Sequence, residues 1–250
     1  MEIKLKKYLS NAGYCSRRKA RDFIENNAVT INGKRASNDS FLQDRDVLII
    51  NAKKEIVNLE INTDILIYHK PTGEICSSKG MDTNKSVFES IPKRTQGKWI
   101  MVGRLDVNTS GLLIFSNNGD LVQKLSHPSS MIKRNYLCRV FGNPTKSQIK
   151  KLLNGVEIDG KNSCFDEIIP MKKKTNAKNN WFKVSLHSGK NREVRKLWET
   201  ESLQVSRLIR IGFGPIELPE DLKKGQYRSL EKNAVERVIN LLEWKAKSLK

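Results

Sequence analysis

The stretch GRLDVNTSGLLIFSNNGDL, residues 103–121, combines a charged loop with a buried strand pattern. Its apolar run, residues 112–115, predicts a strand in the interior of a sheet, and the Asn-Asn-Gly sequence that follows predicts a turn. Before the run, Arg104 and Asp106 lie between two glycines. The stretch alone leaves two interpretations of Asp106 open: an ordinary loop carboxylate or a catalytic group.

Strand-like segments outnumber helical ones in the rest of the chain. Further strand-like runs lie at 47–50, 65–69, 99–102, 136–141, 168–171 and 181–186. Helical patterns lie at 120–126, 145–154 and 191–200, with an amphipathic C-terminal helix over 230–247. Strands and helices do not alternate regularly, as they would in a parallel βαβ fold. We therefore expect an α+β fold with a mixed, mostly antiparallel sheet.

The first fifty residues predict a small separate module with two helices and a few strands. Ser16 is placed as the N-cap of the second helix, and Asn32-Gly33 as a tight hairpin turn. The polar segment NAKKE at 51–55 is interpreted as a linker. We therefore expect a module with its linker at 1–60 and a larger domain at 61–250.

The chain is strongly basic. It has 250 residues, and 46 Lys and Arg against 27 Asp and Glu give a formal net charge of +19. This balance favours polyanionic ligands such as nucleic acids, although charge alone also fits a membrane surface. The segment KKKTNAKNN at 172–180 predicts an exposed basic loop.

Several classes of protein are excluded by composition. No apolar run approaches the roughly 20 residues that a membrane helix needs, and the first twenty residues lack the apolar stretch of a secretory signal. The cysteines Cys15, Cys76, Cys138 and Cys164 form no C-x-x-C pair. We therefore expect no disulfide framework, no metal site and a reducing compartment.

The basic residues of the first module gather on its second helix and its hairpin. Arg17 and Arg21 are one helical turn apart with Arg18 beside them, and Lys34 and Arg35 follow the turn. Such a cluster suits phosphate binding, with an ordinary solvated helix face as the alternative. The segment LKKYLSNAGYCSRRKARDFIENNAVTINGKRA resembles the RNA-binding domain shared with the small-subunit ribosomal protein S-four. The resemblance implies that these five residues bind structured RNA.

Beyond this module, the chain resembles the pseudouridine synthases that modify ribosomal RNA and carry an S-four-like domain in front. The stretch around Asp106 is similar to their motif G-R-L-D-x-x-T-x-G-L-L. Four other motifs follow the family order: YHKPTGEICS (68–77), KRNYLCRVFG (133–142), SGKNREVRKLWE (188–199) and VSRLIRIGFGPIELPEDLKKGQYRSL (205–230). The resemblance thus covers nearly the whole chain and implies a pseudouridine synthase domain.

The resemblance also implies the roles of individual residues. Asp106 is placed as the nucleophile, Tyr136 as the active-site tyrosine, and Arg195 as the arginine that pairs with the carboxylate. Arg104 is expected to rearrange the RNA around a flipped nucleotide, with a structural salt bridge inside its loop as the alternative. Arg192, in the motif that contains Arg195, is expected to contact RNA.

The implied reaction breaks the bond from ribose C1′ to uracil N1 and forms one from C1′ to C5. Because no redox change occurs, we expect no cofactor and no metal. A carboxylate can attack C1′ of the ribose or C6 of the base, and both routes stay open. A nearby arginine would keep it ionised in a partly dry pocket, and the target base must be flipped out of folded RNA.

Within the family, GRLDVNTSGLLIF, NREVRKLWE and VSRLIRIGFG are most similar to the synthases of type B, which act on large-subunit (23S) ribosomal RNA. The implied partner is this RNA or a pre-ribosomal particle. We expect a monomeric cytoplasmic enzyme without a membrane partner. Two alternatives remain: a synthase acting on small-subunit (16S) ribosomal RNA, and a non-catalytic RNA-binding factor of ribosome assembly.

Overall fold

Two compact units make up the chain in the computed structural model, which describes residues 2–59, 62–78, 80–81, 83–95, 97–171 and 179–248. The first unit comprises Met1–Asp64, Lys93–Ile100 and Ser116–Gly119, and the second comprises Ile65–Pro92, Met101–Phe115 and Asp120–Lys250. After residue 64 the chain therefore returns to the first unit twice. Most of the predicted basic loop, residues 172–178, lies outside the described residues.

The first unit packs two short helices against small antiparallel sheets. Its elements are β1 (Glu2–Lys4), α1 (Leu5–Asn11), the 3₁₀ turn η1 (Arg17–Lys19), α2 (Ala20–Asn26), β2 (Val29–Ile31), β3 (Lys34–Arg35), β4 (Phe41–Gln43), β5 (Val47–Ile50) and β6 (Lys53–Ile56). The strands form one sheet of order β3-β2-β5-β6 and one of order β1-β4. Helices and strands share one apolar core, which includes Leu5, Leu9, Ile24, Val29, Leu42 and Leu48.

Two predicted local signals of this unit are confirmed. Asn32 and Gly33 have φ angles of 49° and 81°, as the tight turn between β2 and β3 requires. The Ser16 hydroxyl accepts a hydrogen bond from the backbone N–H of Lys19 at 3.3 Å. The segment it caps begins as the 3₁₀ turn η1, however, so the predicted continuous α-helical face from Arg17 to Arg21 is wrong.

The predicted linker at 51–55 is also wrong. Its last three residues belong to β6, which pairs antiparallel with β5. Asn51 and Ala52 form the turn between the two strands, with φ angles of 49° and 69°. The exposed lysines of β6, Lys53 and Lys54, hide the strand from a search for apolar periodicity.

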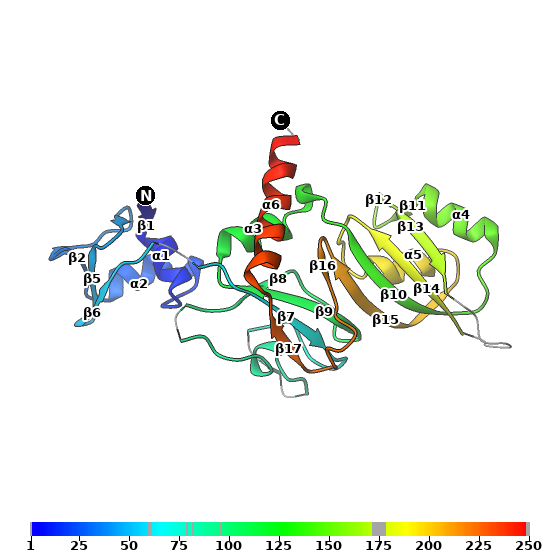
Figure 1. The fold of residues 1–250 in the computed structure, drawn as a ribbon, viewed down its shortest axis with the longest axis horizontal. Helices are drawn as coiled ribbons and strands as arrows, with labels where there is room; N and C mark the ends of the chain where they lie inside the picture. Colours follow the sequence, from blue (N-terminus) through cyan, green and yellow to red (C-terminus); the bar gives the residue numbers. More distant parts are fainter. Residues whose placement is uncertain are drawn as a thin grey trace. The chain divides into compact units, whose positions relative to one another are not determined.

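The second unit is built on a nine-stranded sheet (Figure 1). Its order is β13-β14-β10-β15-β9-β7-β17, with β16 paired to β15 and β8 to β9. The strands are β7 (Ile65–Lys70), β8 (Ile100–Val102), β9 (Thr109–Ser116), β10 (Arg134–Phe141), β13 (Glu167–Pro170), β14 (Asn179–Leu186), β15 (Gln204–Phe213), β16 (Ile216–Glu217) and β17 (Tyr227–Ser229). β15 and β9 run parallel, whereas β10 is antiparallel to both β14 and β15. The predicted α+β fold with a mixed, mostly antiparallel sheet is confirmed.

The predicted helices of this part of the chain are present. The remaining elements are η2 (Val87–Glu89), α3 (Gly119–Ser126), η3 (Pro128–Ser130), α4 (Lys146–Asn154), the hairpin β11 (Val156–Ile158) and β12 (Lys161–Ser163), α5 (Glu193–Glu199) and α6 (Lys232–Ser248). Trp198 of α5 anchors a core against the sheet, with its ring 5.7 Å from that of Phe165 and 5.2 Å from that of Phe182. α6 buries Val235 and Val238, as its amphipathic pattern predicts.

The sequence analysis missed β15 as a strand, although it lies at the centre of the sheet. Two features hide it. Its register against β10 shifts twice, which breaks the simple alternation of buried and exposed positions. It also contains Arg207 and Arg210, and arginine suggests exposure, yet Arg210 is only 3% exposed.

Gly111 allows β9 and β15 to approach each other. It pairs with Arg210 across the two parallel strands and has a φ angle of 109°. A Cβ atom at this position would lie 2.2 Å from the backbone oxygen of Arg210. Both the backbone conformation and the close approach therefore require glycine.

We predict that Gly111→Ala lowers the free energy of unfolding by about 2–5 kcal/mol, since a positive φ and an overpacked contact both cost energy. Gly160→Ala is the matched control, because Gly160 also has a positive φ of 73° but has nothing within 4 Å of the place that a methyl group would take. The control should lose only about 1–2 kcal/mol. Urea denaturation measures both, and equal losses in the two variants would contradict the close approach.

Candidate active site

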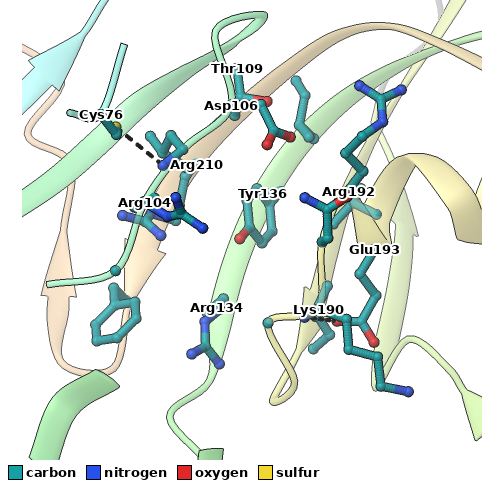
Figure 2. Close-up of a pocket in the computed structure, with 18 of the residues that line it drawn as sticks. Cys76, Arg104, Asp106, Thr109, Arg134, Tyr136, Lys190, Arg192, Glu193 and Arg210 are labelled. Carbon is teal, nitrogen blue, oxygen red and sulfur yellow. Dashed lines mark hydrogen bonds between the residues drawn. The ribbon is translucent and has the colours of Figure 1, made fainter. Parts of the chain in front are cut away.

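A cavity of about 700 Å³ lies in the second unit (Figure 2). Its walls come from the loop before β9, from β10 and β15, and from the loop before α5. Four of the predicted site residues line it: Arg104, Asp106, Tyr136 and Arg192. Segments far apart in the sequence thus bring these side chains to one cavity.

Asp106 belongs to the loop, residues 103–108, that joins β8 to β9. The loop backbone is fixed, because the Asp106 carbonyl accepts the N–H of Thr109 at 3.0 Å and the Val107 carbonyl accepts the N–H of Gly73 at 2.9 Å. The half-buried carboxylate lies close to Tyr136 in Figure 2. Within the described part of the chain this carboxylate has no hydrogen-bond partner, so it remains available to a ligand.

Lys70, at the end of β7, supports this loop from the protein interior. Its side chain is fully buried, and its Nζ donates to the carbonyls of Pro71 at 3.0 Å, Asp106 at 3.2 Å and Thr109 at 3.0 Å. Burial lowers the pKa of Lys70, and the neighbouring thiol and carboxylates oppose this effect. A buried ammonium needs these acceptors, so it draws the carbonyls together and fixes the loop.

Arg195, in α5, holds the same loop from a second side. It is 8% exposed; its Nη1 donates to the Val205 carbonyl at 2.7 Å and its Nη2 to the Asn108 carbonyl at 3.0 Å. The predicted direct pairing with Asp106 is absent: among the described residues, Arg195 forms no ion pair with a carboxylate. Its guanidinium is occupied by backbone carbonyls instead. Burial is the main cause that lowers the pKa of Arg195, and the charge of Asp106 opposes it.

Tyr136 lies on β10, the strand between β14 and β15. It is 9% exposed, and it faces Val184 in β14 and Arg210 in β15. A register shift between Asn135 and Tyr136 marks an irregularity in the β10–β15 pairing. Such irregularities redirect side chains, and in Figure 2 the Tyr136 ring lies between Asp106 and the lower part of the cavity.

The loop before α5 is fixed by a buried carboxylate. Glu193 is 3% exposed, and its two oxygens accept hydrogen bonds from the Ser188 hydroxyl at 2.7 Å and the Lys190 N–H at 3.0 Å. Arg192 precedes it with a φ angle of 52°, and its exposed side chain lies 3.8 Å from Glu199. The loop therefore presents Arg192 to the cavity without a strong ion pair.

Arg104 is exposed and lines the cavity. The alternative interpretation, a structural salt bridge within its own loop, finds no support, because the structure shows no ion pair of Arg104 among the described residues. Its guanidinium is free to meet a ligand.

The sequence analysis missed three cavity residues that carry charge or an aromatic ring: Arg134, Arg210 and Phe213. Arg134 and Arg210 stand in the quoted motifs, but a motif does not reveal that a strand arginine points inward. The burial of Arg210 becomes visible only with the register of β15.

The five predicted RNA-binding residues of the first unit are all exposed: Arg17, Arg18, Arg21, Lys34 and Arg35. Arg21 pairs with Glu25 at 3.1 Å on an open surface, where an ion pair contributes little. Arg35 donates to the Ile24 carbonyl at 3.4 Å, which links β3 to α2. The cluster is therefore accessible to a polyanion.

Two features are absent from the described residues. No helix among them combines the length and apolar character needed to cross a membrane. They also contain no group of three or more His, Cys, Asp and Glu side chains that could hold a metal ion.

We predict that Lys70→Met releases the loop of Asp106. Methionine has a similar length but leaves the carbonyls without their donor, which costs about 1–3 kcal/mol for each buried group left unsatisfied. The amide hydrogens of Thr109 and Gly73, which bond within this loop, should exchange faster with solvent than in the unmodified protein. Lys133→Met is the control, since Lys133 is exposed and only 3.9 Å from Glu167. Unchanged exchange at Thr109 would contradict the support by Lys70.

Comparisons with known proteins agree with this geometry. A family model described as RNA pseudouridylate synthase matches residues 64–200, and a model of the S4 domain matches residues 3–47. A protein of Buchnera aphidicola (strain APS) named ribosomal large subunit pseudouridine synthase B is 41% identical, over 98% of this chain and 99% of its own. A protein of the same name from Vibrio cholerae is 37% identical, over 97% of this chain and 76% of its own.

A crystal structure of a pseudouridylate synthase has the same fold. It aligns with a TM-score of 0.63 at 21% identity, covering 94% of this chain and 99% of that structure. The synthase model spans more than half of the chain, and the curated relatives align over nearly all of it. The resemblance inferred from the motifs is therefore confirmed: the chain belongs to the RNA pseudouridylate synthase family and carries an S4 domain before its synthase domain.

Proposed function

We propose that this chain converts a uridine of large-subunit (23S) ribosomal RNA to pseudouridine, with Asp106 as the nucleophile. The observation that carries the proposal is the unpartnered carboxylate of Asp106 in a cavity lined by arginines. The two relatives named ribosomal large subunit pseudouridine synthase B support the choice of RNA, because they align with both domains of the chain.

The reaction rearranges bonds without gain or loss of atoms. The bond from C1′ to N1 breaks, the detached uracil turns, and a bond from C1′ to C5 forms. C5 then loses its proton and N1 gains one, so the overall charge is unchanged. Asp106 attacks either C1′ or C6 and leaves again when the new bond is complete. Tyr136, next to Asp106, covers the uracil and is placed to move the C5 proton.

Positive charge serves both the nucleophile and the RNA. Arg104 and Arg192 line the cavity, where they favour the ionised carboxylate and attract the phosphate backbone of a flipped nucleotide. Arg195 contributes indirectly, since it binds the Asn108 carbonyl two residues after Asp106. We therefore assign Arg195 a positioning role, with its charge as an additional field.

The two units divide the labour in this proposal. The S4 domain holds structured RNA through its exposed arginines and lysines, and the synthase domain performs the reaction. All residues of the cavity come from one chain, which supports a monomeric enzyme. The substrate, ribosomal RNA or an assembly particle, places the enzyme in the cytoplasm. The alternative of a non-catalytic RNA-binding factor is not favoured, because Asp106 and Tyr136 are present in the cavity.

We predict that Asp106→Asn abolishes pseudouridine formation while the fold and the RNA affinity stay nearly unchanged. Asparagine keeps the shape of aspartate, but its neutral amide is too weak a nucleophile for either route. The measurement is tritium release from ribosomal RNA labelled at uridine C5, with filter binding on the same preparation.

The matched control for this variant is Asp159→Asn, because Asp159 lies in the exposed turn between β11 and β12. It should retain full activity. A carboxylate that acted only as a general base would leave activity reduced by about 10²–10⁴-fold but measurable. Appreciable tritium release by Asp106→Asn would therefore refute the nucleophile assignment.

We also predict that replacing Arg17, Arg18 and Arg21 by Ala weakens RNA binding and flattens its dependence on salt. Each lost phosphate contact releases fewer counterions, so the slope of log K against log salt should decrease by about 0.7–0.9 per contact. Saturating RNA should restore turnover, because the cavity is untouched.

The control variant removes the same charge from exposed positions of the second unit: Lys146, Lys150 and Lys161. It should bind RNA with nearly the original salt slope. Equal slopes for the arginine variant and the unmodified protein would show that the S4 domain does not supply the phosphate contacts.

A further inference from the structure

Two arginines and a phenylalanine form a charged cluster in the cavity that the roles assigned above do not use. The Arg134 guanidinium lies 5.2 Å from the centre of the Phe213 ring, and the Arg210 guanidinium lies 5.4 Å from the same ring. All three residues line the cavity of Asp106. A shared aromatic ring keeps the two cations in place through cation–π contacts.

Arg210 is built into the protein but is not fully satisfied. It is 3% exposed, and its Nε donates to the Leu112 carbonyl at 2.7 Å. Its Nη2 is buried and has no hydrogen-bond partner. Because an unpaired buried donor is costly, a ligand oxygen that reaches this nitrogen would recover that energy.

Arg134 supplies the second cation. Its Nη1 donates to the carbonyls of Ile132 at 2.9 Å, His187 at 2.6 Å and Ser188 at 3.1 Å. These contacts orient the guanidinium without neutralising it. Burial is the main cause that lowers the pKa of Arg134, and the charge of Arg210 acts in the same direction. The two arginines therefore repel each other while the cavity is empty of anions.

No protein group neutralises this pair. Neither arginine forms an ion pair with a carboxylate within the described part of the chain. The cavity contains two carboxylates: Glu193 is occupied by Ser188 and Lys190, and Asp106 is the nucleophile. Burial also raises the pKa of the Cys76 thiol, so this neighbour brings no negative charge.

The missing partner is therefore an anion. A uracil carbonyl could accept one hydrogen bond, but it is neutral and would leave the repulsion between Arg134 and Arg210 in place. A phosphate has several acceptor oxygens and a negative charge, which guanidinium groups bind well. RNA brings one phosphate on each side of every nucleotide.

We propose that Arg134 and Arg210 form a phosphate subsite that binds the RNA backbone next to the flipped uridine. The inference rests on the proposed function and extends it, because it assigns these two arginines to the RNA backbone rather than to the base. By fixing one phosphate, the subsite sets the distance of the ribose from Asp106. Its loss should reduce kcat/KM more than it reduces the affinity for the whole RNA, which the S4 domain also holds.

The test uses the unmodified protein and a fragment of large-subunit ribosomal RNA that contains the uridine it converts. Methylphosphonate groups, which carry no charge, replace one phosphate at a time around this uridine. Neutralising the phosphate in the subsite should lower kcat/KM for tritium release by about 10- to 100-fold, since charge-assisted hydrogen bonds are lost. Neutralising phosphates several nucleotides away should change it far less.

Two variants then identify the protein partner. Arg134→Met and Arg210→Met should show the same loss on unmodified RNA, and the critical methylphosphonate should cause no further loss in them. Arg139→Met is the matched control, because Arg139 also lies on β10 and donates to Ser206 at 2.9 Å outside the cavity. This control should respond to the methylphosphonate as the unmodified protein does.

The outcomes separate the two proposals. If unmodified RNA is not converted at all, the proposed function fails. If it is converted but no methylphosphonate next to the uridine lowers kcat/KM, the phosphate subsite is refuted and the function stands. A methylphosphonate effect that persists undiminished in folded Arg134→Met and Arg210→Met would also refute the assignment to these arginines.

Discussion

The structure of the active site depends on buried cations that bind backbone carbonyls. Lys70 donates to the carbonyls of Asp106 and Thr109, and Arg195 donates to that of Asn108. Since these cations are satisfied by the backbone, the side chain of Asp106 is left without a partner among the described residues and faces the cavity. A reactive carboxylate is thus held by its main chain, which fixes its position without consuming its charge.

The sheet brings the remaining groups to this loop. The parallel pairing of β9 with β15, allowed by Gly111, places Arg210 beside the strand that follows Asp106. The antiparallel pairing of β15 with β10 then adds Tyr136 and Arg134. One central strand therefore connects the loop that carries the nucleophile to the aromatic and cationic walls of the cavity.

The sequence predicted the α+β class, the helices and the residues around Asp106, because those signals are local. It did not reveal β6, whose lysines mask its pairing, or β15, whose buried Arg210 suggests a surface position. The predicted partner of Arg195 was also wrong, since a motif specifies a guanidinium but not whether it binds a carboxylate or a carbonyl. Such choices depend on the three-dimensional neighbours, which only the fold supplies.

The central claim is that this cavity modifies one uridine of large-subunit ribosomal RNA. The most direct measurement maps pseudouridines across all ribosomal RNA from cells with and without this protein. The account predicts that a large-subunit position carries pseudouridine only when the protein is present, while every small-subunit position is unchanged. Loss of a small-subunit pseudouridine instead, or identical maps in both cells, would contradict it.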